Sequence, residues 1–151
     1  MTRAYISIRP SDSDNYLTWY FNGDQYPTGV WKFFGFEELL TPMTTKQVKS
    51  FYKRQYANKP DGVSPSGIVC PWNKPTAIQE ATEPMYDQAT DYNWRFDYRN
   101  PYTSKPFKNK PYLEVEAYSW EQQILNVVDC ANLKENQARV RAWFKTGLAT
   151  V

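Results

Sequence analysis

Residues 91–99 carry the strongest periodic pattern in the chain, with the sequence Asp-Tyr-Asn-Trp-Arg-Phe-Asp-Tyr-Arg. Every second residue is aromatic, and the residues between them are polar or charged. Because successive side chains of a β-strand point to opposite faces, this pattern predicts a strand with one aromatic and one polar face. The aromatic face must be covered by the protein's own core, by a partner or by stacked bases; it is formed by Tyr92, Trp94, Phe96 and Tyr98.

The rest of the composition fits a core built largely from aromatic side chains. Aromatic residues make up 17% of the 151 residues, and a chain of this length is sufficient for one domain with a real core. Tyr and Trp carry a polar atom that needs a partner when buried, so these residues also suit interfaces. We therefore expect a single domain over residues 1–151.

Further alternating runs predict strands at residues 4–8, 16–21, 30–34 and 112–118. Asn22-Gly23 is typical of a hairpin turn, and residues 36–40 fit a single helical turn. The strands at 91–99 and 112–118 are expected to pair as antiparallel neighbours across a long loop. We expect the strand at 91–99 to lie centrally in the sheet, with its aromatic side chains under the helices.

Helices are predicted in two regions. Thr44, followed by Gln47, forms a capping-box pattern, and Met43 and Val48 fit a hydrophobic staple; this helix should end at residues 59–62. Residues 77–81 allow one further helical turn. Residues 119–131 and 133–146 each carry an apolar stripe, which favours two helices, with one long bent helix as the alternative. The predicted fold is α+β, a mostly antiparallel sheet of about five strands with about three helices packed on one face, and long Pro-rich loops.

Two segments do not fit regular structure. Residues 63–86 are interrupted by four prolines, and residues 102–111 form a basic connector that contains two prolines. Proline disfavours long strands and helices, and loops of this length are uncommon unless they have a function. We expect these segments to be extended and to carry the contacts with other molecules.

Several classes of chemistry are excluded by residues that the chain lacks. With no histidine, the Ser-His-Asp and Cys-His arrangements and most zinc sites cannot be formed. No glycine-rich phosphate loop is present, and no cofactor is predicted. The remaining catalytic candidates are carboxylates: Asp61, Glu114 and Glu116 faintly resemble a metal-dependent hydrolase site. The alternative is a solvated strand face, and we expect a protein that is not an enzyme.

Charge is distributed unevenly, although the net charge is only +2. Residues 46–59 are basic, residues 80–91 acidic, and residues 95–110 basic again, a pattern that gives surface patches of defined sign. The sequence shows neither a long apolar run nor an apolar leader, and Cys70 and Cys130 are two isolated thiols. These features favour a cytoplasmic protein, or one assembled into a virus particle, with no membrane partner.

The sequence favours an interaction subunit of a larger assembly, such as a virus-particle component or an accessory subunit of a multi-protein complex. Its partners would be other protein subunits in a homo- or hetero-oligomer. The residues expected to contact a partner lie in or beside the extended segments: Trp72, Tyr86, Tyr102, Phe107 and Tyr112, with Lys105, Lys108 and Lys110.

The main alternative is a module that binds single-stranded nucleic acid. Such proteins combine stacking aromatic side chains with basic residues along a groove. The candidates are the strand residues Trp94, Phe96, Tyr98, Arg95 and Arg99, the connector residues Lys105, Lys108 and Lys110, and the helix residues Lys46, Lys49, Lys53 and Arg54. Against this alternative, Arg95 and Arg99 should point away from the aromatic face, and core packing explains the aromatic residues equally well.

Overall fold

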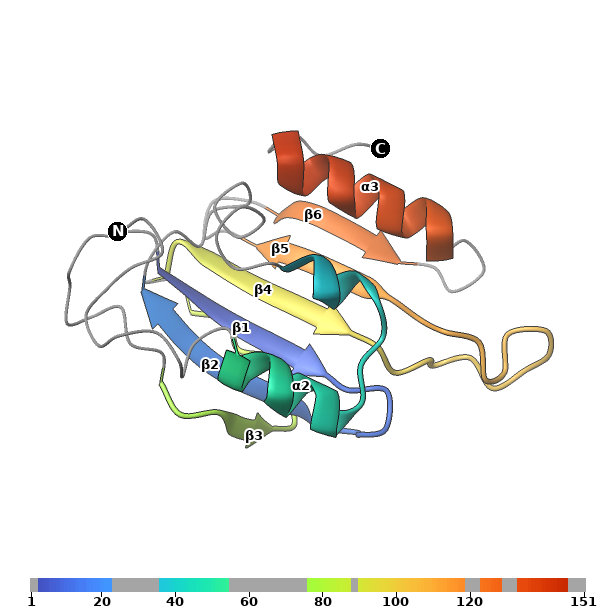
Figure 1. Cartoon of the computed structure of the whole chain (residues 1–151), viewed down its shortest axis with the longest axis horizontal. Coiled ribbons are helices and arrows are strands. Elements are labelled where there is room, and N and C mark those ends of the chain that lie inside the picture. The colour runs from blue at the N-terminus through green and yellow to red at the C-terminus, as the bar shows by residue number, and fades with distance from the viewer. Residues whose placement is uncertain are drawn as a thin grey trace.

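The computed structural model describes residues 3–22, 36–54, 76–87, 90–118, 123–128 and 133–146. Within these residues, six strands form one sheet in the order β3-β2-β1-β4-β5-β6 (Figure 1). The strands are β1 (Arg3–Arg9), β2 (Tyr16–Asn22), β3 (Gln79–Ala81), β4 (Tyr92–Asp97), β5 (Glu114–Tyr118) and β6 (Gln123–Val128). A 3-10 helix and two α-helices accompany them: η1 (Phe36–Leu40), α2 (Thr45–Tyr52) and α3 (Leu133–Thr146).

The sheet is mixed, with one parallel pair at its centre. Strands β1 and β4 are parallel neighbours, in a register that pairs Ile6 with Trp94, whereas the other four neighbouring pairs are antiparallel. The α+β class and the antiparallel pairing of β4 with β5 are therefore confirmed. The sequence patterns do not predict the parallel pair. Parallel strands need a long crossover connection, and β1 and β4 are far apart in sequence.

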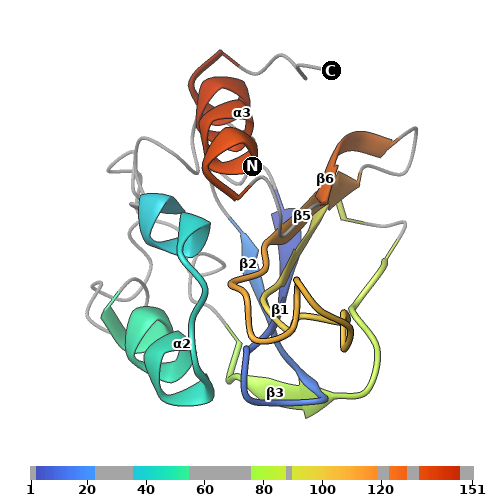
Figure 2. The ribbon, with the colours of Figure 1, turned by 90° about the vertical axis from the view of Figure 1, so that its right-hand side faces the viewer.

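The helices cover one face of the sheet. Figure 2 shows η1 and α2 on one side, while the segment that follows β3 runs along the other side. The core between sheet and helices contains Ile6, Trp94 and Phe96 from the strands, with Phe51 from α2 and Trp143 from α3. The Trp94 and Trp143 rings meet edge to face, with centroids 5.6 Å apart, and such aromatic packing dominates the core as expected.

The aromatic strand is central, and its alternation has the predicted meaning. Trp94, Phe96 and Tyr98 are each at most 1% exposed. The buried Tyr98 hydroxyl donates a hydrogen bond of 2.7 Å to the carbonyl of Leu39 in η1, which provides the partner that a buried phenol needs. The prediction that these side chains pack under the helices is confirmed.

Helix α2 begins as the sequence predicts. Thr44 is its N-cap, and a reciprocal capping box joins the Thr44 and Gln47 side chains to each other's backbone amides. Met43 and Val48, the pair expected to form a hydrophobic staple, are both buried in the core. The predicted end of this helix, at residues 59–62, lies outside the described residues.

Two predicted helical segments are strands instead. Residues 119–131 contain β6, which pairs antiparallel with β5, and residues 77–81 contain β3, which pairs with β2. In 119–131 the spacing of Ile124, Val127 and Val128 fits a helix, but β-branched residues also favour strands. Pairing with the open edge of β5 satisfies that edge and overrides the local pattern.

The remaining helix predictions are borne out or lie outside the described residues. α3 has the predicted bounds, Leu133–Thr146, and η1 occupies the predicted turn at Phe36–Leu40. The described part of the chain thus has two α-helices and not three. The predicted strand at 30–34 and the turn after Asn22 fall on residues that are not described. None of the described helices has the length and apolar character needed to cross a membrane.

Candidate interaction surfaces

The loop between β4 and β5, residues 98–112, is held in one shape by its own hydrogen bonds; we call it the basic loop. The Asn100 side chain donates to the carbonyls of Phe107 (2.8 Å) and Lys110 (2.9 Å) and accepts from the Tyr102 amide (2.7 Å). Asn109 has a φ of 64°, a left-handed conformation that asparagine tolerates better than most residues. The basic loop is therefore a preformed projection from one end of the sheet (Figure 1).

Aromatic contacts attach the basic loop to the sheet. The Tyr102 ring lies 5.6 Å from the Phe107 ring and 6.2 Å from the Tyr112 ring. Tyr112 is 3% exposed, and its hydroxyl donates to Glu114 at 2.8 Å. Burial, together with this bond, raises the pKa of Tyr112 well above its usual range. Tyr112 thus anchors the loop, and the prediction that it contacts a partner is wrong, because its side chain is not accessible.

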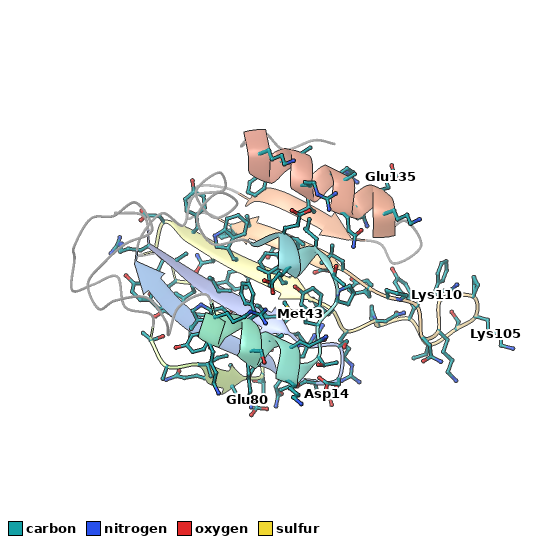
Figure 3. All side chains as sticks on the ribbon, viewed as in Figure 1. Asp14, Met43, Glu80, Lys105, Lys110 and Glu135 are labelled. Carbon is teal, nitrogen blue, oxygen red and sulfur yellow. The ribbon has the colours of Figure 1, made fainter. Side chains whose placement is uncertain are left out.

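The cations of the basic loop remain available to other molecules. Lys105, Lys108 and Lys110 are exposed, and none of them forms an ion pair within the described residues. Figure 3 shows Lys105 and Lys110 on the projecting loop, beyond the end of the sheet. Arg99 is also exposed and pairs with Asp14. The loop thus presents a basic surface.

A cleft of about 680 Å³ lies between the basic loop and the turn after β1. Because β1 and β4 are parallel, their carboxyl ends meet at the same edge of the sheet. The chain leaves β1 toward β2 and leaves β4 toward β5, on opposite sides. The two connections therefore diverge at this edge, and the cleft lies between them. The cleft is lined by Ser11, Asp12 and Pro42 on one wall and by loop residues that include Arg99, Tyr102, Lys108 and Lys110.

A second cleft, of about 450 Å³, lies between η1 and α2 and shares Pro42 with the first. Its lining includes Lys46 and Arg54 of the basic helix face, together with Glu38. Glu38 pairs with Arg54.

In the first cleft, the Asp12 carboxylate accepts hydrogen bonds from the Thr45 hydroxyl (2.7 Å) and amide (2.8 Å), and these bonds lower the pKa of Asp12.

Residues 80–87, which we call the acidic strap, begin in β3 and then cross the opposite face of the sheet. The Met85 amide donates to the Ser7 hydroxyl (2.9 Å), and the Asp87 amide donates to the Asn93 side chain (3.1 Å). The Tyr86 hydroxyl donates to Glu116 at 2.5 Å. The Tyr86 ring also meets the Tyr118 ring edge to face at 5.8 Å. Hydrogen bonds that the strap amides donate to β1 and β4 thus hold the strap across the sheet.

A network of charged side chains on β1, β4 and β5 occupies the same face of the sheet. Arg95 pairs with Glu114 and Glu116, and Arg9 pairs with Asp97. The Arg95 side chain is only 13% exposed. Burial acts to lower its pKa, but the two glutamates outweigh this effect and raise it. A buried arginine with such partners remains charged.

The carboxylates proposed for a metal site are part of this network. The Arg95 guanidinium is already paired with both Glu114 and Glu116, so the two strand residues do not form a free ligand pair. The described residues contain no cluster of three potential metal ligands, and Asp61 lies outside them. The expectation of a solvated strand face is also wrong, because both glutamates are largely buried.

The structure separates the nucleic-acid candidates into two groups. Trp94, Phe96 and Tyr98 are core residues that cannot reach a base, and Arg95 is held by acids; for these four residues the prediction is wrong. The fold excludes them because the helices cover the aromatic face of β4. The remaining candidates are all exposed: Arg99, Lys105, Lys108 and Lys110 on the basic loop, and Lys46, Lys49, Lys53 and Arg54 on or just after α2.

Among the predicted partner contacts, Tyr86 and Tyr102 are 48% and 42% exposed, Phe107 is half-buried, and Trp72 lies outside the described residues. Met85, Tyr118 and Pro42 were missed. The acidic run 80–91 was visible in the sequence, but Tyr118 is more than thirty residues from its contact Tyr86. Only the fold, in which the Tyr86 side chain reaches Tyr118 and Glu116 on β5, brings them together.

Comparisons with protein-family models, with curated proteins and with solved structures found no match to this chain.

Proposed function

We propose that this chain is a non-enzymatic assembly subunit that binds further copies of itself, with the basic loop of one copy seated on the acidic strap of the next. The observation that carries this proposal is the placement of the exposed large apolar side chains. Within the described residues there are four: Met85, Tyr86 and Tyr118 lie together at the strap, and Tyr102 lies on the basic loop. Exposed Met and aromatic side chains of this kind are typical anchors of protein interfaces.

The two surfaces carry opposite charge. The basic loop presents Lys105, Lys108 and Lys110, whereas the strap presents the exposed Glu83 with Asp87 beside it. Glu80, also exposed, lies at the β3 end of the strap, where its carboxylate accepts a hydrogen bond of 3.0 Å from the Asn15 side chain. Complementary charges around apolar anchors promote docking and fix its register. Two acidic straps would repel each other, and so would two basic loops. The basic loop of one copy therefore fits the acidic strap of another copy better than either surface fits its own counterpart.

The geometry favours contact between molecules. Figure 3 shows Lys105 and Lys110 beyond one end of the sheet, whereas Glu80, at the start of the strap, lies on the β3 edge away from the loop. A contact between two different patches is heterologous, and repeating it builds a ring or an open filament. The chain would therefore form head-to-tail oligomers, the behaviour expected of a subunit of a larger particle.

Charge reversal on each surface tests the proposal. The purified chain should show a light-scattering mass that rises with concentration and falls at high salt, because screening weakens contacts between exposed charges. A loop variant, Lys105→Glu with Lys110→Glu, and a strap variant, Glu80→Lys with Glu83→Lys, should each be monomeric. Mixing the two variants should restore association, because each loop then meets a strap of opposite charge.

Lys134→Glu on α3 is the matched control, since Lys134 is exposed and lies on neither surface. This variant should associate like the wild-type chain. A wild-type chain that remains monomeric at every concentration would overturn the proposal. Reversed variants that do not associate when mixed would also overturn it, provided that both have the wild-type circular dichroism spectrum.

A further inference from the structure

Two clefts adjoin at Pro42, which lines both of them, and we call the two together the Pro42 groove. The first cleft reaches the basic loop, and the second lies along η1 and α2. Three chain segments that are far apart in sequence build its walls: residues 11–12, residues 38–54 and residues 98–112. None of the acidic-strap residues belongs to it.

Cations line the whole length of the Pro42 groove. Arg99, Lys108 and Lys110 contribute to the first cleft, and Lys46 and Arg54 contribute to the second. Lys46, Lys108 and Lys110 form no ion pair within the described residues. Positive groups thus follow one another along a concave surface, where their fields add and attract anions.

The acids of the groove are engaged in contacts of their own. Asp12 accepts two hydrogen bonds from Thr45 at the start of α2, and Glu38 pairs with Arg54. Asp14, the partner of Arg99, is 81% exposed, so that pair is a solvated one that contributes little. Asp12 keeps its negative charge, because both of its donors are neutral, but the unpaired cations Lys46, Lys108 and Lys110 outnumber it, so the described part of the groove is positive on balance.

One aromatic ring completes the wall. Tyr102 lines the first cleft, is 42% exposed and meets the Phe107 and Tyr112 rings at 50° and 65°. These contacts restrict the orientation of the Tyr102 ring, and its exposed part is available to a planar group in the cleft. Lys108 and Lys110 lie in the same cleft, so a stacked group and an attached anion can be bound together.

We propose that the Pro42 groove binds single-stranded nucleic acid, with the backbone phosphates on Lys46, Lys108 and Lys110 and one base stacked on Tyr102. Single-strand sites combine a basic groove that follows the backbone with aromatic stacking platforms. The groove thus supplies both elements on one surface, which the buried aromatic face of β4 cannot do. An acidic peptide would use the same cations but has no planar group to place on Tyr102.

Fluorescence anisotropy with a labelled single-stranded oligonucleotide at about 50 mM salt tests the proposal. Binding should weaken as salt rises, with a log–log slope of about −2 for three phosphate contacts. Lys108→Ala with Lys110→Ala should lower the affinity and make the slope shallower. Tyr102→Leu should lower the affinity for the oligonucleotide at least about fivefold while leaving the affinity for inorganic polyphosphate unchanged.

Two controls separate this groove from general electrostatics and from the assembly contact. Lys134→Ala removes an exposed cation outside the groove, and Lys105→Ala removes one from the loop tip, which does not line either cleft. Both variants should bind the oligonucleotide like the wild-type chain. Lys105 takes part in the assembly proposal alone. The oligonucleotide experiment can therefore be interpreted even if the chain does not self-associate, and the self-association experiment can be interpreted even if no oligonucleotide binds.

Three results would overturn the proposal. The first is no binding of the oligonucleotide at about 50 mM salt. The second is an equal loss of affinity in Lys134→Ala and in the double groove variant. The third is binding of poly-glutamate as tight as that of the oligonucleotide, with no effect of Tyr102→Leu, which would assign the groove to an acidic peptide.

Discussion

At the scale of single residues, Tyr86 shows how a side chain can be exposed and still be held in place. Its ring is about half exposed, yet its hydroxyl donates to Glu116 at 2.5 Å. Burial of the phenol and its bond to Glu116 raise the pKa of Tyr86 to about 12. The bond requires the protonated hydroxyl, so the attachment of the strap at this point depends on the protonation state of Tyr86.

This dependence gives a pH prediction for Tyr86→Phe. The pKa is raised above its ordinary value of 10.0, so the stabilisation is present below pH 10 and is lost as pH rises through the folded-state pKa. The variant should be less stable than wild type by about 1 kcal/mol at pH 8. That difference should shrink toward zero as pH approaches 12, measured by urea denaturation at each pH. A difference that stays constant across this range would show that the hydroxyl bond does not hold the strap.

At the scale of elements, α2 begins at the residue that a short capping pattern in the sequence predicts. Thr44 and Gln47 satisfy each other's backbone amides, as the spacing of the two residues predicts. The start of this helix also fixes the shape of the Pro42 groove, because Lys46 follows immediately and Asp12 is bonded to Thr45. The N-cap therefore supports the candidate binding site as well as the helix.

Replacing the cap residue, Thr44→Ala, should lower the free energy of unfolding by about 1 kcal/mol, because the Gln47 amide loses its acceptor. Chemical denaturation monitored by circular dichroism measures the change. Thr44→Ser, which keeps the hydroxyl, should retain nearly all of the wild-type stability. Equal losses in the two variants would mean that the methyl group, and not the hydrogen bond, accounts for the effect.

At the scale of the whole molecule, a few aromatic contacts join distant parts of the chain. The Trp94–Trp143 contact connects α3 to the centre of the sheet, and the Gln137 side chain donates to the Leu40 carbonyl of η1 at 2.6 Å. With Trp143 only 2% exposed, removal of its indole leaves a cavity that the neighbouring strands and helices cannot fill.

Trp143→Ala should therefore lower the free energy of unfolding by about 3–5 kcal/mol, measured by urea denaturation at neutral pH. The exposed residue Lys134 on the same helix provides the comparison, since Lys134→Ala should change stability by less than about 0.5 kcal/mol. A loss below about 1 kcal/mol for Trp143→Ala would show that α3 contributes little to the core.

The sequence by itself determined the features that depend on neighbours along the chain. The alternation in residues 91–99 identified the buried face of β4, the Thr44–Gln47 pair located the start of α2, and the apolar stripe placed α3. The same patterns did not reveal β6, because the spacing of Ile124, Val127 and Val128 fits a helix, whereas their β-branched side chains also favour a strand. The open edge of β5 decided between them, and that edge exists only in the folded sheet.

Only the tertiary structure decided which of the candidate contact residues are accessible. Tyr102 and Tyr112 belong to the same loop and have similar sequence surroundings, but one is exposed and the other is buried against the sheet. The Met85–Tyr86–Tyr118 surface and the Pro42 groove likewise join segments that are far apart in sequence. Their physical basis is the sheet topology, in which the parallel pairing of β1 with β4 sets where the connecting loops leave the sheet and which side chains meet there.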